Sequence, residues 1–303
     1  MEWETNLIKT YFLVSEYFWI FDACNERFSN NNTPKFTDIE VATIYFFCTT
    51  DEFGLDTKKV IYSYADRHLR TWFPNLPKYE AFCYRVNQLS EAFRYLAMAI
   101  NKDYLSQHND YQNDVIELIG NSLPIMMAKG SRSFSAKVAT SIAEQGYCAT
   151  KKMYYHGLKL HCLNVVASEK KLPHPMFSTL SSAAVHDYEI FKNDLLPNLS
   201  HSKCYLDSAY FDESNKAYYR EKYNVEIHAI AKKQRGQKEL FADQNYTNTM
   251  ISRLRQPIEG FFNWLIEKTS IQDASKTRAT KGVLSHTYGK IAAAYVYLAI
   301  FNF

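Results

Sequence analysis

The chain has 303 residues, 47% of them hydrophobic, and we expect two domains because a single core rarely grows beyond about 250 residues. Aromatic residues make up 16% of the chain, which excludes a disordered or low-complexity protein. No apolar run reaches the ~18 residues that span a bilayer, and the first residues lack the basic start of a signal peptide. The sequence therefore predicts a cytoplasmic protein without a membrane partner.

Charge is distributed unevenly along the chain, although the formal net charge is only +3. Residues 1–114 hold 16 acidic and 11 basic side chains, whereas residues 122–175 hold 8 basic and 2 acidic ones. Residues 232–255 are also basic, with 6 basic and 2 acidic side chains. Two basic segments on a nearly neutral chain are typical of a localised phosphate contact, and a solvated surface is the alternative for each.

Cysteine spacing argues against a metal ribbon and against a disulfide framework, because no CxxC pair occurs. We expect all of them to be reduced core thiols. The six cysteines are Cys24, Cys48, Cys83, Cys148, Cys162 and Cys204.

Residues 1–110 are predicted to form a separate, all-helical N-terminal domain. Apolar residues recur at helical spacing from Ile8 to Phe18, residues 37–40 offer cap residues, and a second helical stretch covers residues 80–100. The prolines of residues 72–77 break the helix between them. This domain is a candidate for DNA-end binding or dimerisation, although its acidic balance argues against a purely electrostatic role.

Residues 111–303 are predicted to form an α/β domain whose elements follow the order β-β-β-α-β-α-β-α. This is the order of a ribonuclease-H-like mixed sheet with flanking helices, and strands that alternate with helices favour such a layered fold. The expected strands are residues 115–119, 157–167, 175–180, 204–207 and 226–231, and the expected helices between them are residues 187–195 and 213–223. A break is expected at residues 120–124, directly after the first strand.

The last helix of this domain is expected to begin near Thr249. Its apolar residues step by three and four, which gives one stripe that faces the sheet. Pro257 should kink the helix or restart it, because a proline removes one backbone hydrogen bond. The apolar run 292–303 is too short for a membrane and predicts a buried closing helix. The stripe consists of Ile251, Leu254, Ile258, Phe261 and Leu265.

Two acidic residues stand out as candidate ligands for divalent metal ions. Asp207 ends a buried strand, and a carboxylate there points toward the edge where open α/β sheets carry their sites. Glu259 shares a helix face with Arg255, four residues earlier. Each has an ordinary alternative: a turn or cap for Asp207, and a solvated side chain or a surface ion pair for Glu259.

Three short motifs resemble those of DDE-type bacterial insertion-sequence transposases, and the chain is most similar to the insertion-sequence family numbered nine-eighty-two. Residues 206–212, LDSAYFD, resemble the D-x-A-Y motif around the second Asp of that family. Arg255-x-x-x-Glu259 resembles R-x-x-x-E around the final Glu, and residues 119–124, IGNSLP, resemble D-S-x-P with Asn121 at the Asp. The resemblance covers nearly the whole chain, including Trp72-Phe73-Pro74 and residues 146–152.

The resemblance implies a DNA transposase that binds inverted-repeat transposon ends, cleaves them and transfers the strand to target DNA. It implies two Mg²⁺ ions, with Mn²⁺ as a substitute, held by Asn121, Asp207 and Glu259 as metal-binding and catalytic residues. It also implies a homodimer on double-stranded DNA in the bacterial nucleoid. Two rival functions stay open: a ribonuclease-H-like nuclease or resolvase, and a catalytically silent DNA-binding protein derived from a transposase.

The sequence departs from the family pattern at three positions. Ser252 replaces the Tyr before Arg255, and Ile266 stands where a Lys is expected, with Lys268 nearby. Contacts to the terminal phosphate would therefore depend on Arg255 and Lys268. Asn121 supplies a neutral oxygen in place of an anionic one, so the metal pair would lose a charged ligand.

Three explanations of Asn121 remain open. It is a substitution introduced to prevent cleavage, or it marks a decayed or domesticated copy, or the alignment is shifted. In the last case Asp114 or Glu117 would serve, although neither lies at the exit of the expected strand.

Further basic residues are expected to contact DNA phosphates. Lys129, Arg132, Lys151 and Lys152 lie in a long connection between the first two strands, together with Tyr147, Tyr154 and Tyr155, whose rings suit base stacking. A flexible solvated loop is the alternative. The other candidates for DNA binding are Lys159, Lys232, Lys233, Arg253, Arg255 and Lys268.

Histidines give weaker signals. His156 and His161 are five residues apart on an expected strand, so they point to opposite faces and do not share a metal ion. His186-Asp187 resembles a His-Asp pair of the family, and a helix N-cap is the alternative for Asp187.

Overall fold

The computed structural model describes residues 2–24, 34–50, 54–107, 115–166, 172–210, 212, 214–233 and 236–301. The chain divides into two compact units. A helical unit comprises Met1–Tyr104, Lys137–Ser141 and Leu265–Phe303, and an α/β unit comprises Leu105–Ala136 and Ile142–Trp264. The helical unit thus takes in the C-terminal part of the chain, which the expected boundary at residue 110 assigned to the catalytic domain.

The helical unit is built around buried aromatic rings. Phe46 lies 5.1 Å from Phe93, and Tyr45 stacks on Phe93 at 5.7 Å between ring centroids. Gly289 lets the last helix approach these rings, because a Cβ there would lie 2.7 Å from Tyr45. The helices are α1 (Glu2–Glu16), α2 (Phe18–Ala23), α3 (Asp38–Thr50), α4 (Lys58–His68), α5 (Tyr79–Gln88), α6 (Ser90–Gln107) and α10 (Thr280–Phe301), with the end of α6 in the other unit.

Most sequence predictions for these helices are confirmed. Thr37 and Glu40 form a capping box before α3: Glu40 accepts from the Thr37 N–H at 2.6 Å, and the Thr37 hydroxyl accepts from the Glu40 N–H at 3.2 Å. The run 292–303 belongs to the largely buried α10, although residues 302–303 lie outside the described part. The stretch 80–100 is two helices, because α5 ends at Gln88 and α6 starts at Ser90.

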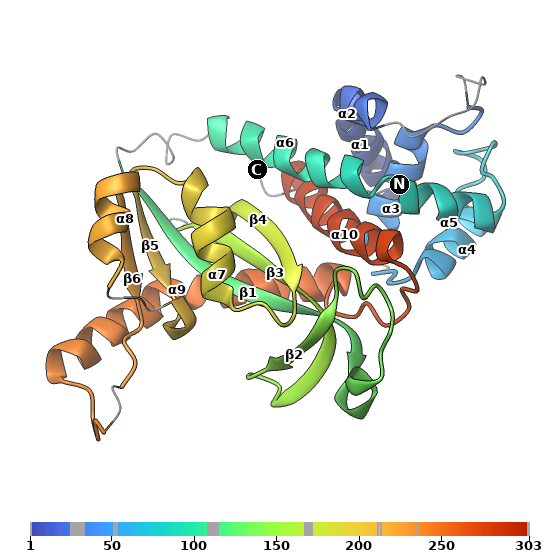
Figure 1. Ribbon diagram of the computed structural model, residues 1–303. Coiled ribbons are helices and arrows are strands. Elements are labelled where there is room, and N and C mark those ends of the chain that lie inside the picture. Colours follow the sequence, from blue (N-terminus) through green and yellow to red (C-terminus); the bar gives the residue numbers. More distant parts are fainter. Residues whose placement is uncertain are drawn as a thin grey trace. The chain divides into compact units, whose positions relative to one another are not determined.

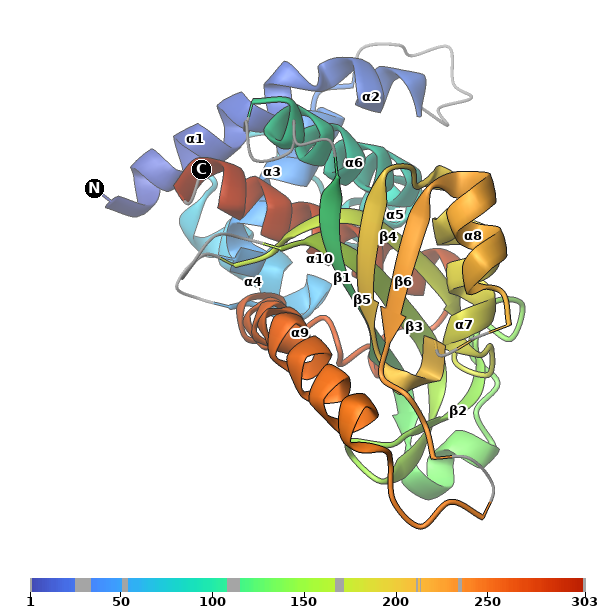
Figure 2. The same cartoon turned by 90° about the vertical axis from the view of Figure 1, so that its left-hand side faces the viewer.

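The α/β unit contains one mixed sheet, in which β1 pairs with β3 on one side and with β5 on the other (Figures 1 and 2). Strand β3 is antiparallel to its neighbours β1, β2 and β4, whereas β5 is parallel to its neighbours β1 and β6. The predicted α/β class and mixed sheet are confirmed. The strands are β1 (Ile116–Lys129), β2 (Glu144–Cys148), β3 (Met153–Val165), β4 (His174–Ser182), β5 (Ser202–Leu206) and β6 (Val225–Ala229).

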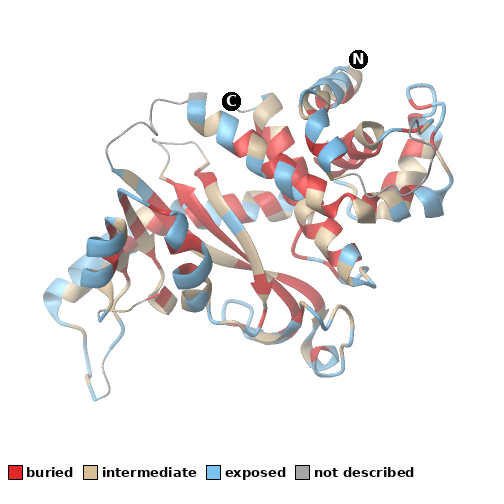
Figure 3. Ribbon diagram, turned by 45° about the horizontal axis from the view of Figure 1, so that its top comes forward, coloured by how far each residue is buried: buried red, intermediate tan, exposed pale blue. Residues whose placement is uncertain are grey.

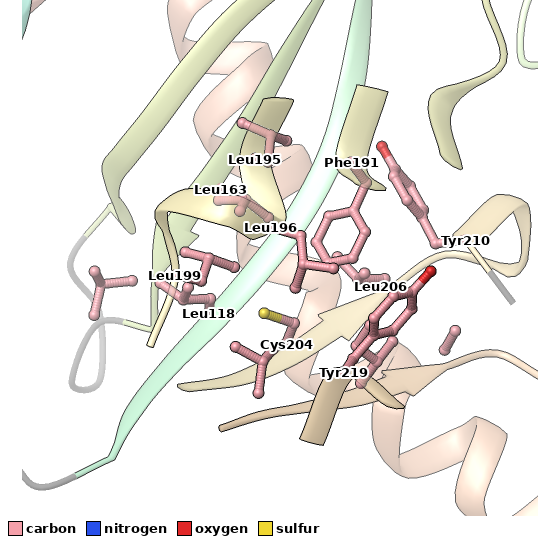
Figure 4. Close-up of a cluster of buried hydrophobic side chains, with 14 residues drawn as sticks. Leu118, Leu163, Phe191, Leu195, Leu196, Leu199, Cys204, Leu206, Tyr210 and Tyr219 are labelled. Carbon is pink, nitrogen blue, oxygen red and sulfur yellow. The ribbon is translucent and has the colours of Figure 1, made fainter. Parts of the chain in front are cut away.

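Helical segments cover both faces of this sheet. Figure 4 shows the core on one face, where Leu118 and Cys204 of adjacent strands meet Phe191 and Tyr219 from the covering helices. In Figure 3 the strands are largely red and the outer sides of the covering helices are pale blue. The covering segments are α7 (Asp187–Ile190), a π-helical turn η3 (Phe191–Leu195) and α8 (Lys216–Tyr223), and α9 (Ala242–Thr269) runs along the opposite face (Figure 2).

The structure corrects the expected break at residues 120–124, because β1 continues without interruption to Lys129. Asn121 therefore lies in the middle of a strand and not at its exit. Beyond Ile119, β1 pairs with β3 alone, so Pro124 occupies an edge stretch, where a missing N–H is tolerated. The ladder with β3 is one residue out of register between Met126 and Ala128, which marks a bulge.

Two further segments differ from the elements expected from the sequence. The connection after β1 contains a 3-10 turn, η2 (Gly130–Phe134), and strand β2, neither of which was expected. The last helix begins at Ala242 and is not restarted at Pro257. Four of the five expected stripe residues are buried along it, and Leu254 is half-buried.

Within the described residues, no helix combines the length and hydropathy needed to cross a bilayer. None of the six cysteines forms a disulfide, as predicted, but only four are core residues, because Cys24 and Cys83 are half-buried.

Candidate functional site

Asn121 and Asp207 lie on neighbouring elements of the sheet. The pairs between the parallel strands β1 and β5 run one to one, from Ile116 opposite Ser202 to Ile119 opposite Tyr205. Asn121 lies in β1 two residues beyond the last of these pairs, and Asp207 lies two residues beyond it on the other side, directly after β5. Two residues that are far apart in the sequence are therefore both near the carboxyl end of β5.

Each of these side chains is tied to the backbone that follows it. The Asn121 Oδ1 accepts from the Ser122 N–H at 2.9 Å, and the Asp207 Oδ1 accepts from the Ser208 N–H. Both side chains are half-buried. The second carboxylate oxygen of Asp207 accepts no hydrogen bond from any described residue, so it is available to a ligand.

Helix α9 is fixed to the end of β6 by the amide of Asn248. Its Oδ1 accepts from the Ala231 N–H at 2.8 Å, and its Nδ2 donates to the Ala231 carbonyl at 3.1 Å. A hollow of about 570 Å³ extends from Ile230 along α9 to the exposed Glu259. Within the described part of the chain, the Glu259 carboxylate has no hydrogen-bond or ion-pair partner.

Arg255 lines the same hollow and is unusual for a cation. Only 7% of it is exposed, and its Nε has no hydrogen-bond partner in the described part of the chain. Burial and the negative charges of Asp187 and Asp207 raise the pKa of Tyr210, while the positive charge of Arg255 lowers it. One buried phenol thus lies within electrostatic reach of both Asp207 and Arg255.

A polar network supports the strand beside Asn121. The Ser122 hydroxyl donates to Asp187 Oδ2 at 2.7 Å, and Lys159 Nζ donates to Asp187 Oδ1 at 2.7 Å and to the Val185 carbonyl at 2.7 Å. Burial would raise the pKa of Asp187, but the Lys159 ammonium and the Ser122 hydroxyl outweigh it, so the pKa is lowered. This network links the residue after Asn121 to the start of α7.

The structure defines the roles of two histidines singled out in the sequence. The His186 ring caps α7 by accepting from the Tyr188 N–H, so the alternative N-cap role of Asp187 is wrong. Burial lowers the pKa of His161 to about 4, and its ring bonds to the Ser181 hydroxyl at 2.8 Å. His161 is therefore a neutral core residue at pH 7.

Of the two alternatives to Asn121, the structure places only Glu117, and not beside Asp207. Glu117 is four residues earlier in β1, where it pairs with Lys203 at the start of β5 and accepts from the Tyr205 hydroxyl at 3.0 Å. Asp114 lies outside the described residues.

The predicted DNA-binding residues fall into several groups. Lys159 is held in the Asp187 network, and Arg255 is buried in the hollow. The Lys268 ammonium lies 5.1 Å from the centroid of the Tyr297 ring in the helical unit. The exposed residues are Lys129, Arg132, Lys151 and Lys152 around β2 and Lys232, Lys233 and Arg253 near the hollow, with the Lys233 ammonium bonded to the Lys238 carbonyl.

Sequence reasoning missed the role of Ser122 and the exposed ring of Phe134. Ser122 was part of the D-S-x-P resemblance, but its partner Asp187 is 65 residues away and only the fold brings them together. Phe134 carried no signal beyond its place in a basic segment.

The chain matches no family model, no curated protein and no solved structure. Among the described residues, no three His, Cys, Asp or Glu side chains lie close enough together to hold a metal ion. A site made from Asn121, Asp207 and Glu259 contains only two such side chains.

Proposed function

We propose that the chain is a DNA transposase of the DDE type, built on a ribonuclease-H-like sheet, with Asn121 at the position of the first metal-binding acid. The chain order supports the fold: β1, β3 and β4 form an antiparallel set, followed by α7, β5, α8, β6 and α9. This is the order β-β-β-α-β-α-β-α, with the β2 hairpin as an addition. The fold alone does not establish a function.

The observation that carries the proposal is that β1 and β5 are adjacent parallel strands, with Asn121 in β1 and Asp207 directly after β5, each two residues beyond the pair Ile119–Tyr205. Asp207 thus lies at the carboxyl end of its strand, where α/β sheets place their sites, whereas Asn121 lies within β1 near that end. The third residue, Glu259, comes from α9, which the amide of Asn248 fixes to the same edge. The order of the three residues and their elements is the one that the motifs imply.

The donor atoms fit a hard divalent cation. An amide oxygen from Asn121 and carboxylates from Asp207 and Glu259 are oxygen ligands of the type that Mg²⁺ and Mn²⁺ prefer. Bound ions would activate the attacking oxygen and neutralise charge on the leaving oxygen. With Asn121 in place, the set has two anionic groups where the family pattern supplies three.

Arg255 is suited to hold a DNA phosphate. A guanidinium presents five N–H donors in a planar fork, and phosphate oxygens match that geometry. Because its Nε has no partner among the described residues, a phosphate in the hollow would satisfy a buried donor that these residues leave unpaired. The resemblance adds that two copies of the chain pair the two transposon ends as a homodimer.

A second candidate function is DNA binding without cleavage. Asn121 itself favours it, because a neutral ligand binds the cation more weakly, and the cation's position sets the geometry of attack. Under this alternative, the chain recognises transposon ends but leaves them uncut. Both candidate functions predict that the chain binds DNA. They differ in whether the variant Asn121→Asp cleaves that DNA.

The test is the variant Asn121→Asp on duplexes that carry the inverted repeats flanking the reading frame. We expect magnesium- or manganese-dependent cleavage to rise on the order of a thousand-fold, which is about 4 kcal/mol of barrier. Asn121 and Asp have nearly the same shape, and either Oδ1 can accept from the Ser122 N–H, so the fold should not change.

The matched control is Asn121→Asp combined with Asp207→Ala, which should stay inactive while binding DNA. Cleavage by the control would show that the activity does not come from this site. Normal binding without cleavage by Asn121→Asp would refute the transposase and favour the silent DNA-binding protein. A preference for four-way junctions over repeat ends would favour a resolvase.

A further inference from the structure

Three exposed aromatic rings form a continuous row on the β2–β3 hairpin and the turn beside it. Tyr147 and Tyr154 are cross-strand partners with ring centroids 5.1 Å apart, and Phe134 of η2 lies 5.5 Å from Tyr154. Their exposed fractions are 52%, 49% and 67%. Large apolar rings gathered on a surface mark a contact site more often than rings scattered singly.

The row is held in shape by its surroundings. Gln145 on β2 donates to the Ser133 hydroxyl at 3.2 Å, and that hydroxyl donates to the Gly130 carbonyl at 2.7 Å, which ties η2 to the hairpin. Gly130 adopts φ +59°, a left-handed conformation that turns the chain out of β1 and that glycine adopts without strain. The rings are therefore preorganised, so less ordering entropy is lost when a ligand binds.

Basic residues lie near the row. Lys151 and Lys152 lie in the tip of the hairpin, one residue pair beyond the Tyr147–Tyr154 pair, and Arg132 is exposed in the same turn as Phe134. The acidic residue of the hairpin, Glu144, accepts a hydrogen bond from the Ser182 hydroxyl. Aromatic faces bordered by cations complement a ligand that combines flat rings with phosphates.

We propose that Phe134, Tyr147 and Tyr154 form a stacking platform for unpaired bases of the DNA that the chain binds, with the flanking cations on the phosphates. This inference rests on the proposed function, because it takes DNA as the ligand. It adds that the DNA is recognised where its bases are unpaired. Stacked bases of an intact duplex do not present their faces, whereas a frayed end or a single-stranded extension does. The hairpin would therefore select DNA ends with unpaired nucleotides.

The test compares a blunt duplex with the same duplex extended by a short unpaired oligothymidine, at fixed salt. We expect the protein to bind the extended duplex roughly tenfold more tightly, because stacking on an aromatic side chain contributes about 1–3 kcal/mol per base. Tyr154→Ala should lose this preference and leave binding of the blunt duplex unchanged, whereas Tyr154→Phe should keep it. Tyr84→Ala removes an exposed ring on α5 and is the matched control without effect.

Two additional measurements separate stacking from charge. A 2-aminopurine in the unpaired extension should be quenched on binding by the wild type and by Tyr154→Phe but not by Tyr154→Ala. Replacing Lys151 and Lys152 with Ala should weaken binding of both DNAs and flatten the salt dependence by about 0.7–0.9 log unit for each lost phosphate contact.

The outcomes distinguish this inference from the proposed function. Normal binding of both DNAs with no preference for the extension, or a preference that survives Tyr154→Ala, would overturn the platform alone. A protein that binds neither DNA would overturn the platform together with the transposase. If Tyr154→Ala binds both DNAs as the wild type does but no longer binds a protein partner, the rings form a protein contact and not a platform for bases.

Discussion

The Asp187 network allows the cost of removing one carboxylate to be worked out. The side chains of Lys159 and Asp187 are only 17% and 16% exposed, so solvent screens their attraction weakly. Asp187→Ala would remove two hydrogen bonds to a charged group and leave the Lys159 ammonium with the Val185 carbonyl as its remaining partner among the described residues. Removing one member of a buried ion pair costs about 3–5 kcal/mol, and at this partial exposure we expect about 3 kcal/mol.

The assay is urea denaturation followed by circular dichroism. With a slope of about 2 kcal/mol per molar urea, the midpoint should fall by about 1.5 M. The pKa of Asp187 is lowered in the folded state, so its stabilisation is fully present above the unfolded pKa of ~3.9. It is lost as pH falls through the folded-state pKa, so the difference between wild type and variant should shrink below about pH 4.

A double-mutant cycle with Lys159→Met decides whether the ion pair causes the effect. If the pair is responsible, Asp187→Ala should cost much less in the Lys159→Met background than in the wild type. Equal costs in both backgrounds would refute the reasoning, because they would show that Asp187 acts without Lys159.

Two further predictions concern packing and buried charge. Gly157→Ala should lower the free energy of unfolding by more than about 3 kcal/mol, because the new methyl group would overlap the Ile125 carbonyl of the paired strand. The control is Gly260→Ala, which has open space at its Cβ and should be neutral or stabilising. Both variants are measured by urea denaturation. Equal effects of the two would contradict the packing argument. Burial lowers the pKa of Lys290 to about 8 against the opposing charges of Asp56 and Asp273, so Lys290→Met should raise the free energy of unfolding at pH 7 by about 2 kcal/mol. Between pH 8 and ~10.4, Lys290 is protonated in the unfolded chain and neutral in the folded one, so the stability gained by Lys290→Met should fade as pH rises through that window. A variant that is destabilised at pH 7 would show instead that the Lys290 ammonium is well solvated.

The sequence predicted the elements that depend on local pattern. The capping box at Thr37 and Glu40, the buried α10 and the apolar stripe of α9 all follow from spacing that one helix satisfies by itself. The order of strands and helices in the α/β unit was also predictable, because alternation of period and turn residues marks each element.

The errors come from tertiary pairing that local pattern does not encode. Gly120 and Pro124 are typical breakers, yet β1 runs through both. A side chain at Gly120 would overlap Leu206 and Leu163, so the glycine permits close packing in the sheet and does not end the strand. Likewise, nothing near Asp187 in the sequence indicates Ser122 or Lys159 as its partners.

The residue type at position 121 matters for the proposed chemistry but not for the fold. In the middle of β1 its backbone is paired with Cys162 of β3, and its Oδ1 accepts from the next N–H. Neither interaction needs a negative charge, so the sheet forms equally well with an amide or with a carboxylate. The proposed metal site does need that charge, because Asp207 and Glu259 would leave the ions one anionic ligand short. A change that leaves the fold intact would therefore switch off the proposed chemistry, while the surfaces proposed to bind DNA, Arg255 in the hollow and the aromatic row on the hairpin, stay as they are.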